Sequence, residues 1–386
     1  QLRLDYFIKI NTVQLKLLLL LLLPLQLIAG VSIFNGTVVE ATSQLPVAGA
    51  MVFVNRSKEF TVTDSAGKFS LIDTLNPTVE LVVSKAGFQT SAYVVTSETS
   101  ASEFRFELVK ESPEIGHIDS SKTGVYEEAF LKIFFGTTYN TAETFITNPA
   151  ILQYSFNGQT GTLSVKSNGL LEIINDGLGY MIHYQLDTFS LVVSNGLSDF
   201  QGYCFFTSLS TKKPFIVEKW NMRRQLAYKG SMQHFVKAVY ADKVIAEGFS
   251  ISKVVRYLEG ESGYKGALKS KYLVRAGSLN VNGNKTGYAD VTDAAKMTST
   301  NTMRCDSANQ TYFHYPGPLL VQWSGKDQQA FLTNEEMPQM ISLFLFGNQK
   351  VKMCANGLYY DKPDLYVQGF MREKIADLLP LEYRGL

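Results

Sequence analysis

Apolar and polar positions alternate with a period of two in short runs between residues 31 and 110. In the last of these runs, Phe104, Phe106 and Leu108 share one face. The runs are rich in Val, Ile, Phe, Leu and Thr, and are bounded by Gly, Pro, Asn or Asp. About seven such strands in some eighty residues predict a small β-sandwich of two packed sheets.

The stretch TVTDSAGKFSLI, residues 61–72, predicts a tight turn between two of these strands. Asp64 begins the turn, where its carboxylate can accept hydrogen bonds from the following amides. Gly67 closes it, at a positive φ that glycine adopts without strain, and Phe69 then points into the sandwich. A calcium ligand at Asp64 is the alternative, but no Asp-rich run supplies the six or more oxygens that Ca²⁺ takes.

Residues 111–125 are polar and lack periodicity, which predicts a linker. Tyr126, Phe130 and Phe134 then recur at helical spacing, and Gly136 is a stop signal. Strand-like runs follow from residue 151 to 209. They are separated by pairs that favour β-hairpins, namely Asn157–Gly158, Asn168–Gly169, Asp176–Gly177 and Asn195–Gly196. These signals predict an antiparallel sheet.

Residues 217–243 return to helical spacing. Gly230 followed by Ser231 predicts the end of one helix and the N-cap of the next. An apolar stripe along these helices is expected to pack on the sheet, with a ligand groove as the alternative. The stripe consists of Trp220, Arg224, Tyr228, Met232, Phe235 and Val239.

Residues from about 256 to 311 are rich in Gly, Ser, Lys and Asn and predict a long polar insertion. Strand-like runs return at 318–324, 340–346 and 349–360, and residues 366–383 predict a short helix. The expected fold is therefore mainly β: an N-terminal β-sandwich, followed over 126–386 by an α+β domain built on antiparallel sheet with a few helices.

The first thirty residues have a different character. Lys9 and Lys16 both precede an apolar run over residues 17–25. This run is shorter than the roughly 20 residues that are needed to cross a bilayer. A basic flank, a short leucine core and small residues up to Gly30 predict a secretory signal peptide over residues 1–30, with an uncleaved anchor as the alternative. No transmembrane span is expected after cleavage. No Cys follows the leucine run, so a lipoprotein anchor is not supported.

The composition is nearly charge-neutral and aromatic. A net charge of +1, from 36 basic and 35 acidic residues, does not support a nucleic-acid partner. The 25 Phe and 20 Tyr residues are typical of a β-rich extracytoplasmic protein. Cys204, Cys305 and Cys354 are widely spaced, which predicts buried apolar side chains rather than a disulfide framework, although one pair could form.

The sequence contains no recognisable catalytic motif. Zinc carboxypeptidases need an HxxE pair and a distant third ligand, and none of His117, His183, His234 and His314 has Glu three residues later. His183, His234 and His314 remain as ligands only if the fold brings them together. The segment GFSIS lacks the last glycine of a nucleophile elbow. We therefore predict no catalytic, cofactor-binding or metal-binding residues and no cofactor.

The first domain resembles a known family. The segments GTVVEATSQLPVAGAMVFV, TVTDSAGKFSLI and ELVVSKAGFQT are similar to the carboxypeptidase-like regulatory domain, a transthyretin-like sandwich, over residues 31–110. The matching residues are Gly36, Pro46, Gly49, Ala50, Asp64, Gly67, Phe69, Ser84, Gly87 and Phe88. In that family the module is accessory. KWNMRRQLAYKGSMQHF and ADLLPLEY further resemble two-domain envelope proteins of Gram-negative bacteria, whose second domain has no settled activity.

This resemblance implies a non-enzymatic protein exported across the inner membrane to the periplasm or outer membrane. Its role would be structural or binding, with an envelope protein or glycan as partner. The alternative is a peptidase-like hydrolase whose site is assembled in the second domain. Converging titratable side chains in a deep pocket would favour the hydrolase, and an exposed aromatic patch would favour the binding protein.

Overall fold

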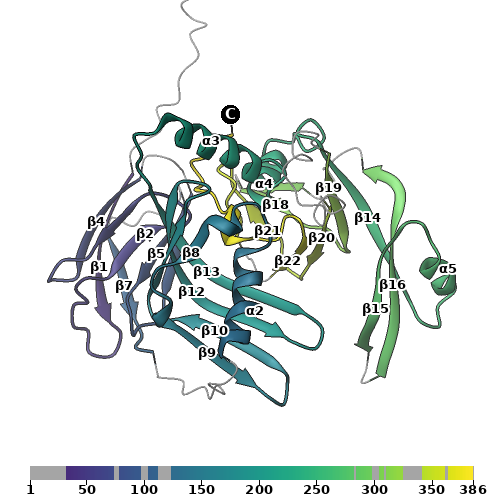
Figure 1. Cartoon of the computed structure of the whole chain (residues 1–386), viewed down its shortest axis with the longest axis horizontal. Helices are drawn as coiled ribbons and strands as arrows, with labels where there is room; N and C mark the ends of the chain where they lie inside the picture. The colour runs from purple at the N-terminus through teal and green to yellow at the C-terminus, as the bar shows by residue number, and fades with distance from the viewer. Residues whose placement is uncertain are drawn as a thin grey trace, which may run out of the picture.

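The computed structural model describes residues 32–73, 78–96, 103–111, 123–281, 284–297, 304–307, 310–324, 341–360 and 364–385. The predicted signal peptide, His117 and the side chain of Cys305 lie outside these described residues. Within these ranges, no helix has both the length and the apolarity that a membrane crossing requires. Figure 1 shows the N-terminal strands (purple), a central sheet (teal), a third group of strands (green) and the C-terminal segment (yellow) between the last two.

The first part of the chain is a β-sandwich, as the sequence predicts. Its described strands are β1 (Ser32–Glu40), β2 (Met51–Val54), β3 (Phe60–Val62), β4 (Lys68–Asp73), β5 (Val79–Ser84), β6 (Ser91–Val95) and β7 (Phe104–Leu108). One sheet has the order β4-β1-β7, and the other has the order β3-β2-β5-β6. Val52, Leu81 and Leu108 are fully buried between the two sheets. Each such side chain stabilises the fold by about 1.5–3 kcal/mol.

The predicted turn at residues 64–67 is confirmed. The Asp64 carboxylate accepts hydrogen bonds from the amides of Ala66 (2.9 Å) and Lys68 (2.8 Å). Gly67 has a φ of +71°, and a Cβ there would lie 2.4 Å from the carbonyl oxygen of Val38. Phe69 is buried in the sandwich core. The stretch is therefore a structural turn.

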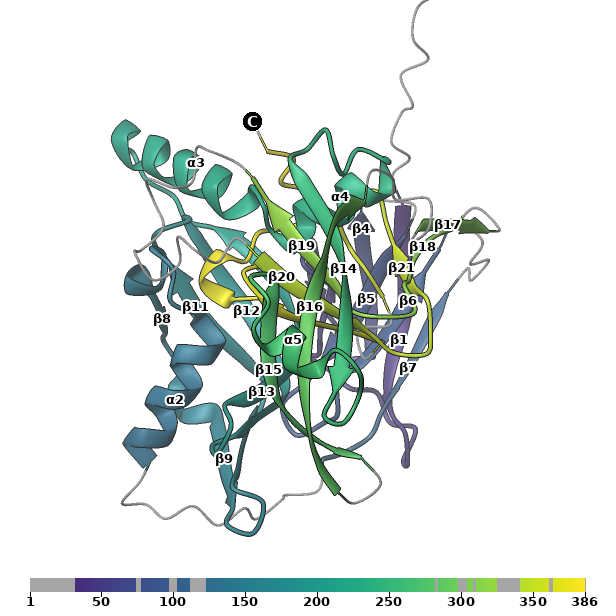
Figure 2. The same cartoon turned by 90° about the vertical axis from the view of Figure 1, so that its right-hand side faces the viewer.

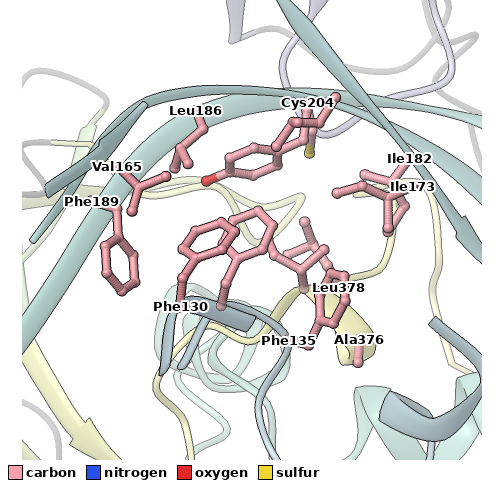
Figure 3. Close-up of a cluster of buried hydrophobic side chains, with 14 of the residues drawn as sticks. Phe130, Phe135, Val165, Ile173, Ile182, Leu186, Phe189, Cys204, Ala376 and Leu378 are labelled. Carbon is pink, nitrogen blue, oxygen red and sulfur yellow. The ribbon is translucent and has the colours of Figure 1, made fainter. Parts of the chain in front are cut away.

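The second domain begins with an antiparallel sheet covered by a helix. The strands are β8 (Thr144–Ile146), β9 (Leu152–Asn157), β10 (Thr162–Ser167), β11 (Leu170–Asn175), β12 (Tyr180–Val192) and β13 (Leu197–Ser208). Helix α2 (Thr123–Phe135) ends one residue before the predicted stop at Gly136. Figure 3 shows Phe130 of α2 among the apolar side chains of the sheet, and its ring meets that of Phe189 edge-on at 5.0 Å. Phe130 and Phe134 are both fully buried.

Three of the four predicted hairpin turns join directly paired strands: β9 with β10, β11 with β12, and β12 with β13. The hairpin predicted at Asn168–Gly169 is wrong. It links β10 and β11, which pair with successive parts of the same strand, β12. Because β12 is 13 residues long, it has room for both. The Asn168 side chain instead accepts a hydrogen bond from the amide of Gly87 in the sandwich, at 3.0 Å.

Two helices, α3 (Pro214–Tyr228) and α4 (Met232–Tyr240), connect this sheet to the next one. The predicted cap is confirmed, because Ser231 Oγ accepts a hydrogen bond from the amide of His234 at 3.2 Å. Tyr228 packs in the core under α2, whereas Phe235 packs in the core of the next sheet. Four stripe residues, Tyr228, Met232, Phe235 and Val239, thus belong to the two cores. Trp220 and Arg224 instead donate to backbone carbonyls, at 2.7 Å each.

The third part of the chain is a second large sheet of order β15-β16-β14-β19-β20-β22, with a small sheet of order β17-β18-β21. Its elements are β14 (Phe249–Leu258), α5 (Tyr264–Leu268), β15 (Leu273–Val281), β16 (Asn284–Met297), β17 (Arg304–Ser307), β18 (Gln310–Phe313), β19 (Leu319–Trp323), β20 (Ile341–Phe346), β21 (Val351–Met353) and β22 (Leu365–Gly369). The segment predicted as a polar insertion contains α5, β15, β16 and β17. There Asp290 is fully buried between Arg256 and Arg275, each with a nitrogen within 2.8 Å of it.

The short helix predicted over residues 366–383 is wrong. The segment forms most of β22 and a single 3₁₀ turn, η6 (Ile375–Asp377); two similar turns are η2 (Thr141–Glu143) and η3 (Pro149–Ile151). Gly369 has a φ of +92°, which no helix accepts. Ile375 and Leu378 are buried in the core under α2, so packing against several elements determines this path.

Candidate functional site

The sandwich docks on the second domain through the turn between β2 and β3. Among the described strands, β13 pairs only with β12. The β2–β3 turn lies along the opposite edge of β13. The amide of Arg56 donates to the carbonyl of Cys204 (2.6 Å), and the amide of Phe206 donates to the carbonyl of Ser57 (2.8 Å). From the C-terminal segment, the amide of Leu381 donates to the carbonyl of Arg56 at 2.7 Å. Backbone hydrogen bonds on both sides therefore hold this turn.

Aromatic and polar contacts extend this interface. The ring of Phe205 stacks on Phe60 of the sandwich (4.6 Å between centroids) and on His183 (4.4 Å). Thr90 Oγ1 of the sandwich donates to Asp187 Oδ1 of β12 at 2.8 Å. Burial raises the pKa of Asp187 to about 6, against the opposing effect of the Thr90 hydrogen bond. The two domains thus share an apolar centre and a specific polar rim.

Arg56 is conformationally strained and buried. Its φ is +58°, a left-handed conformation that costs a non-glycine residue roughly 1–2 kcal/mol. The side chain is 7% exposed, its Nη1 lies 3.3 Å from Glu373 Oε1, and its Nη2 makes a long hydrogen bond of 3.4 Å to the carbonyl of Leu379. Its Nε is buried and has no hydrogen-bond partner among the described residues. Strain and an unsatisfied donor mark this side chain as a candidate for binding.

Arg56 lines a pocket where the sandwich, α3, α4 and the C-terminal segment meet; the last three lie side by side in Figures 1 and 2. We call it the interdomain pocket. Its volume of about 360 Å³ falls within the range of small-molecule sites, roughly 300–1,000 Å³. Its largely apolar lining residues are Met222, Leu226, Ala227, Met232, Tyr359, Phe370, Met371, Leu378 and Leu379. Its polar ones are Arg56, Thr138, Tyr139, Asn140, Arg223, Ser231, Gln233, Arg372, Glu373, Lys374 and Asp377.

A polar network on Asp377 forms part of this lining. Asp377 Oδ1 accepts hydrogen bonds from Thr138 Oγ1 (2.9 Å) and Asn140 Nδ2 (2.8 Å). Burial raises the pKa of the Asp377 carboxyl. Asn140 Oδ1 is buried without a partner among the described residues. A Cβ on Gly177 would lie 2.8 Å from this oxygen and 2.9 Å from Arg223 Nη1, so a larger residue would require these two side chains to shift.

Cationic side chains outnumber carboxyl groups in the lining. Arg56, Arg223, Arg372 and Lys374 stand against Glu373 and Asp377. Arg223 pairs with Glu143 at 2.9 Å. Arg372 donates to the neutral carbonyl of Ser198 (2.9 Å). Lys374 Nζ lies 5.4 Å from the centre of the Phe370 ring and also interacts with the Asp377 carboxyl. The excess positive charge favours an anionic ligand.

His234, a potential metal ligand in the sequence, has both ring nitrogens engaged. Its Nδ1 accepts a hydrogen bond from the amide of Gly230 (3.0 Å), so its Nε2 carries the hydrogen that points to Glu247 Oε2 (3.1 Å). Neither nitrogen is left to bind a metal or to take a proton from a substrate. The residue is a structural link between α4 and the segment before β14.

The other described histidines lie in different surroundings. His183 Nε2 is 3.3 Å from Thr207 Oγ1, and the ring of His314 meets the ring of Phe346 at 5.7 Å. Within the described ranges, no group of three or more His, Cys, Asp or Glu side chains is placed to hold a metal ion. Cys204 and Cys354 are buried, as predicted for them.

Of the lining residues, Met232 belongs to the predicted apolar stripe, for which a ligand groove is the alternative, but the sequence does not predict Arg56 in the pocket wall. Arg56 follows Asn55 in an ordinary polar turn, and left-handed φ values are expected at Gly or Asn rather than at Arg. The helix predicted over residues 366–383 is wrong, so the sequence does not place these residues in the pocket wall either.

The comparisons with known proteins identify the first domain. Residues 34–117 match the family model described as the CarboxypepD_reg-like domain. No curated protein matches the chain.

Solved structures that are similar to the chain include the following two. A 9R-lipoxygenase from Cyanothece PCC8801 is 11% identical, with a TM-score of 0.15, over 58% of this chain and 49% of its own, so the chain spans about half of that protein. A protein of unknown function from Bacteroides fragilis NCTC 9343 is 10% identical, with a TM-score of 0.17, over 67% of this chain and 94% of its own. Scores this low support no argument about fold or function. The family match, in contrast, identifies the N-terminal sandwich as a CarboxypepD_reg-like domain, which is a regulatory rather than a catalytic module.

Proposed function

We propose that this protein is a non-enzymatic binding protein of the cell envelope and that its ligand occupies the interdomain pocket. In this proposal the CarboxypepD_reg-like domain is a scaffold that holds Arg56 in the pocket wall. The observation that carries the proposal is the left-handed, buried Arg56, clamped through its backbone by Cys204 and Leu381. Strain of this kind persists only where surrounding structure enforces it, and it concentrates at functional sites.

The envelope setting rests on the predicted signal peptide and on the aromatic, charge-neutral composition. The partner is then an envelope protein or glycan, or a small molecule carried by one of them, and not a nucleic acid. A pocket of about 360 Å³ holds one small molecule or the end of a larger one.

One observation favours the alternative of a hydrolase. Glu373 and Asp377 both line the pocket, and paired carboxyl groups can act as general acid and base. Their contacts support the binding role instead. Glu373 is paired with Arg56 at 3.3 Å, and Asp377 Oδ1 already accepts two hydrogen bonds.

The test is a photo-crosslinking amino acid at Met222, which lines the pocket and is 46% exposed, in the full chain in its native envelope. The matched control carries the same group at Val193, which is 57% exposed and outside the pocket. We expect one dominant intact adduct at Met222 that is absent at Val193. The same adducts at both positions would contradict the proposal, and a cleaved product at Met222 would favour the hydrolase.

A further inference from the structure

From the chemistry of the lining we infer that the interdomain pocket binds a single-chain amphiphile with a carboxylate head group and an unbranched apolar tail. This inference rests on the proposed function, because it names the ligand class of the same pocket. Three observations carry it: the unsatisfied edge of Arg56, the excess of cations, and the methionine-rich wall.

The guanidinium of Arg56 has one edge available for a carboxylate. Its Nη1 faces Glu373, but Nε has no partner among the described residues, and Nη2 has only the 3.4 Å contact with the carbonyl of Leu379. Nε and one Nη are the pair of donors that bind a carboxylate through two parallel hydrogen bonds. A carboxylate bound at this edge would replace the long Nη2 contact. An acceptor from the ligand would then remove the cost of a buried unsatisfied donor.

The charges of the lining favour an anionic head over a neutral or cationic one. Glu373 is paired with Arg56, whereas Arg372 contacts a neutral carbonyl. Burial raises the pKa of Asp377, while the nearby Lys374 and the hydrogen bonds from Asn140 and Thr138 oppose the rise. A cationic head group would meet several positive charges at once.

The rest of the wall suits a flexible hydrocarbon chain. Met222, Met232 and Met371 line it together with Leu226, Leu378 and Phe370. Methionine side chains are unbranched and polarisable, so they adapt to a chain that takes several conformations.

Calorimetry on the full chain tests this inference, with sodium octanoate, decanoate and dodecanoate below their micelle concentrations. Each added methylene should lower Kd about fourfold until the pocket is filled. Decanol should bind about ten- to a hundredfold more weakly than decanoate, because it lacks the charged acceptor. Decyltrimethylammonium should not bind. Equal binding of decanoate and decanol, or the absence of saturable decanoate binding, would overturn the inference.

The variant Arg56→Gln should lose about ten- to a hundredfold in decanoate affinity and keep its decanol affinity, which shows that the pocket is intact. A second variant, Lys374→Gln, leaves Arg56 and its backbone hydrogen bonds in place. It should weaken decanoate binding by a smaller factor. The control is Arg105→Gln, an exposed arginine of the same domain. Unchanged decanoate affinity in Arg56→Gln would refute the role of this side chain. An intact adduct at Met222 without decanoate binding would refute only the proposed ligand class. If there is neither an adduct specific to Met222 nor decanoate binding, the proposed function is refuted too.

Discussion

The interface between the two domains should depend on pH through Asp187. Burial, helped by the nearby Glu111, raises the pKa of this carboxyl from 3.8 to about 6 in the folded protein, against the opposing hydrogen bonds from Thr90 and Gln185. The folded state therefore binds a proton more tightly than the unfolded state. The stabilisation from this group is complete below pH 4, and it is lost as the pH rises through 6.

The magnitude follows from the size of the shift. A difference of about 2 pKa units, at 1.36 kcal/mol per unit, corresponds to at most roughly 3 kcal/mol of stability lost between pH 4 and pH 8. Asp187→Asn removes the ionisation, and the amide oxygen can still accept the hydrogen bond from Thr90. We expect this variant to be more stable than the parent protein by about 1–3 kcal/mol at pH 8 and nearly equal to it at pH 4.

Urea unfolding at several pH values between 4 and 8 measures this difference directly. Asp199→Asn, at an exposed position on the neighbouring strand β13, is the matched control for the loss of one carboxylate. Thr90→Val removes a hydrogen bond that favours the ionised form, so its pH transition should move upward. If the difference between Asp187→Asn and the parent protein is constant with pH, or grows toward low pH, the reasoning is wrong.

Three further predictions concern stability, each measured by urea unfolding of the full chain. Gly67→Val should cost more than Gly87→Val: both glycines have a positive φ, which costs about 1–2 kcal/mol, but only at Gly67 does a Cβ meet a backbone oxygen, at 2.4 Å. Equal costs would exclude that clash. Asp290→Asn should destabilise the protein by about 3–5 kcal/mol, because it leaves Arg256 and Arg275 without their buried partner. Burial opposes ionisation of Asp290, but the hydrogen bonds from the two arginines outweigh it and lower the pKa of this carboxyl. The stabilisation that Asp290 provides should therefore be lost as the pH falls below 4. A parent protein whose stability does not change in that pH range would contradict this. Ser231→Ala should cost about 1 kcal/mol through the lost helix cap, and Ser210→Ala, in an irregular segment before α3, should cost less.

The elements that the sequence predicted correctly are those specified by nearby residues. The turn at Asp64 and Gly67 needs only its own carboxylate and a glycine at positive φ. The start of α4 needs only Gly230 and the hydroxyl of Ser231. In each case the partners lie within four residues, so composition and spacing determine the conformation.

The features that the sequence did not predict depend on partners far along the chain. Arg56 is held by Cys204 and Leu381, which are separated from it by about 150 and 325 positions. Asn168–Gly169 has the composition of a hairpin, yet the length of β12 lets β10 and β11 pair with it in succession. Residues 370–379 are apolar enough for a helix, but they are buried against α2 and the sheet, not along one helical face. Tertiary contacts override local preference at all three places.

The way the sandwich docks bears on what a regulatory domain contributes to a binding site. A domain that acts only as a spacer needs no strained residue at its boundary, and its interface can be polar and loosely packed. Here the turn of the sandwich completes the edge of β13, stacks Phe60 on Phe205, and brings Arg56 into the pocket. An edge strand covered in this way is also protected from pairing with other chains. Removing the sandwich would therefore expose the β13 edge and take away the guanidinium of Arg56, so the second domain alone would have an incomplete pocket.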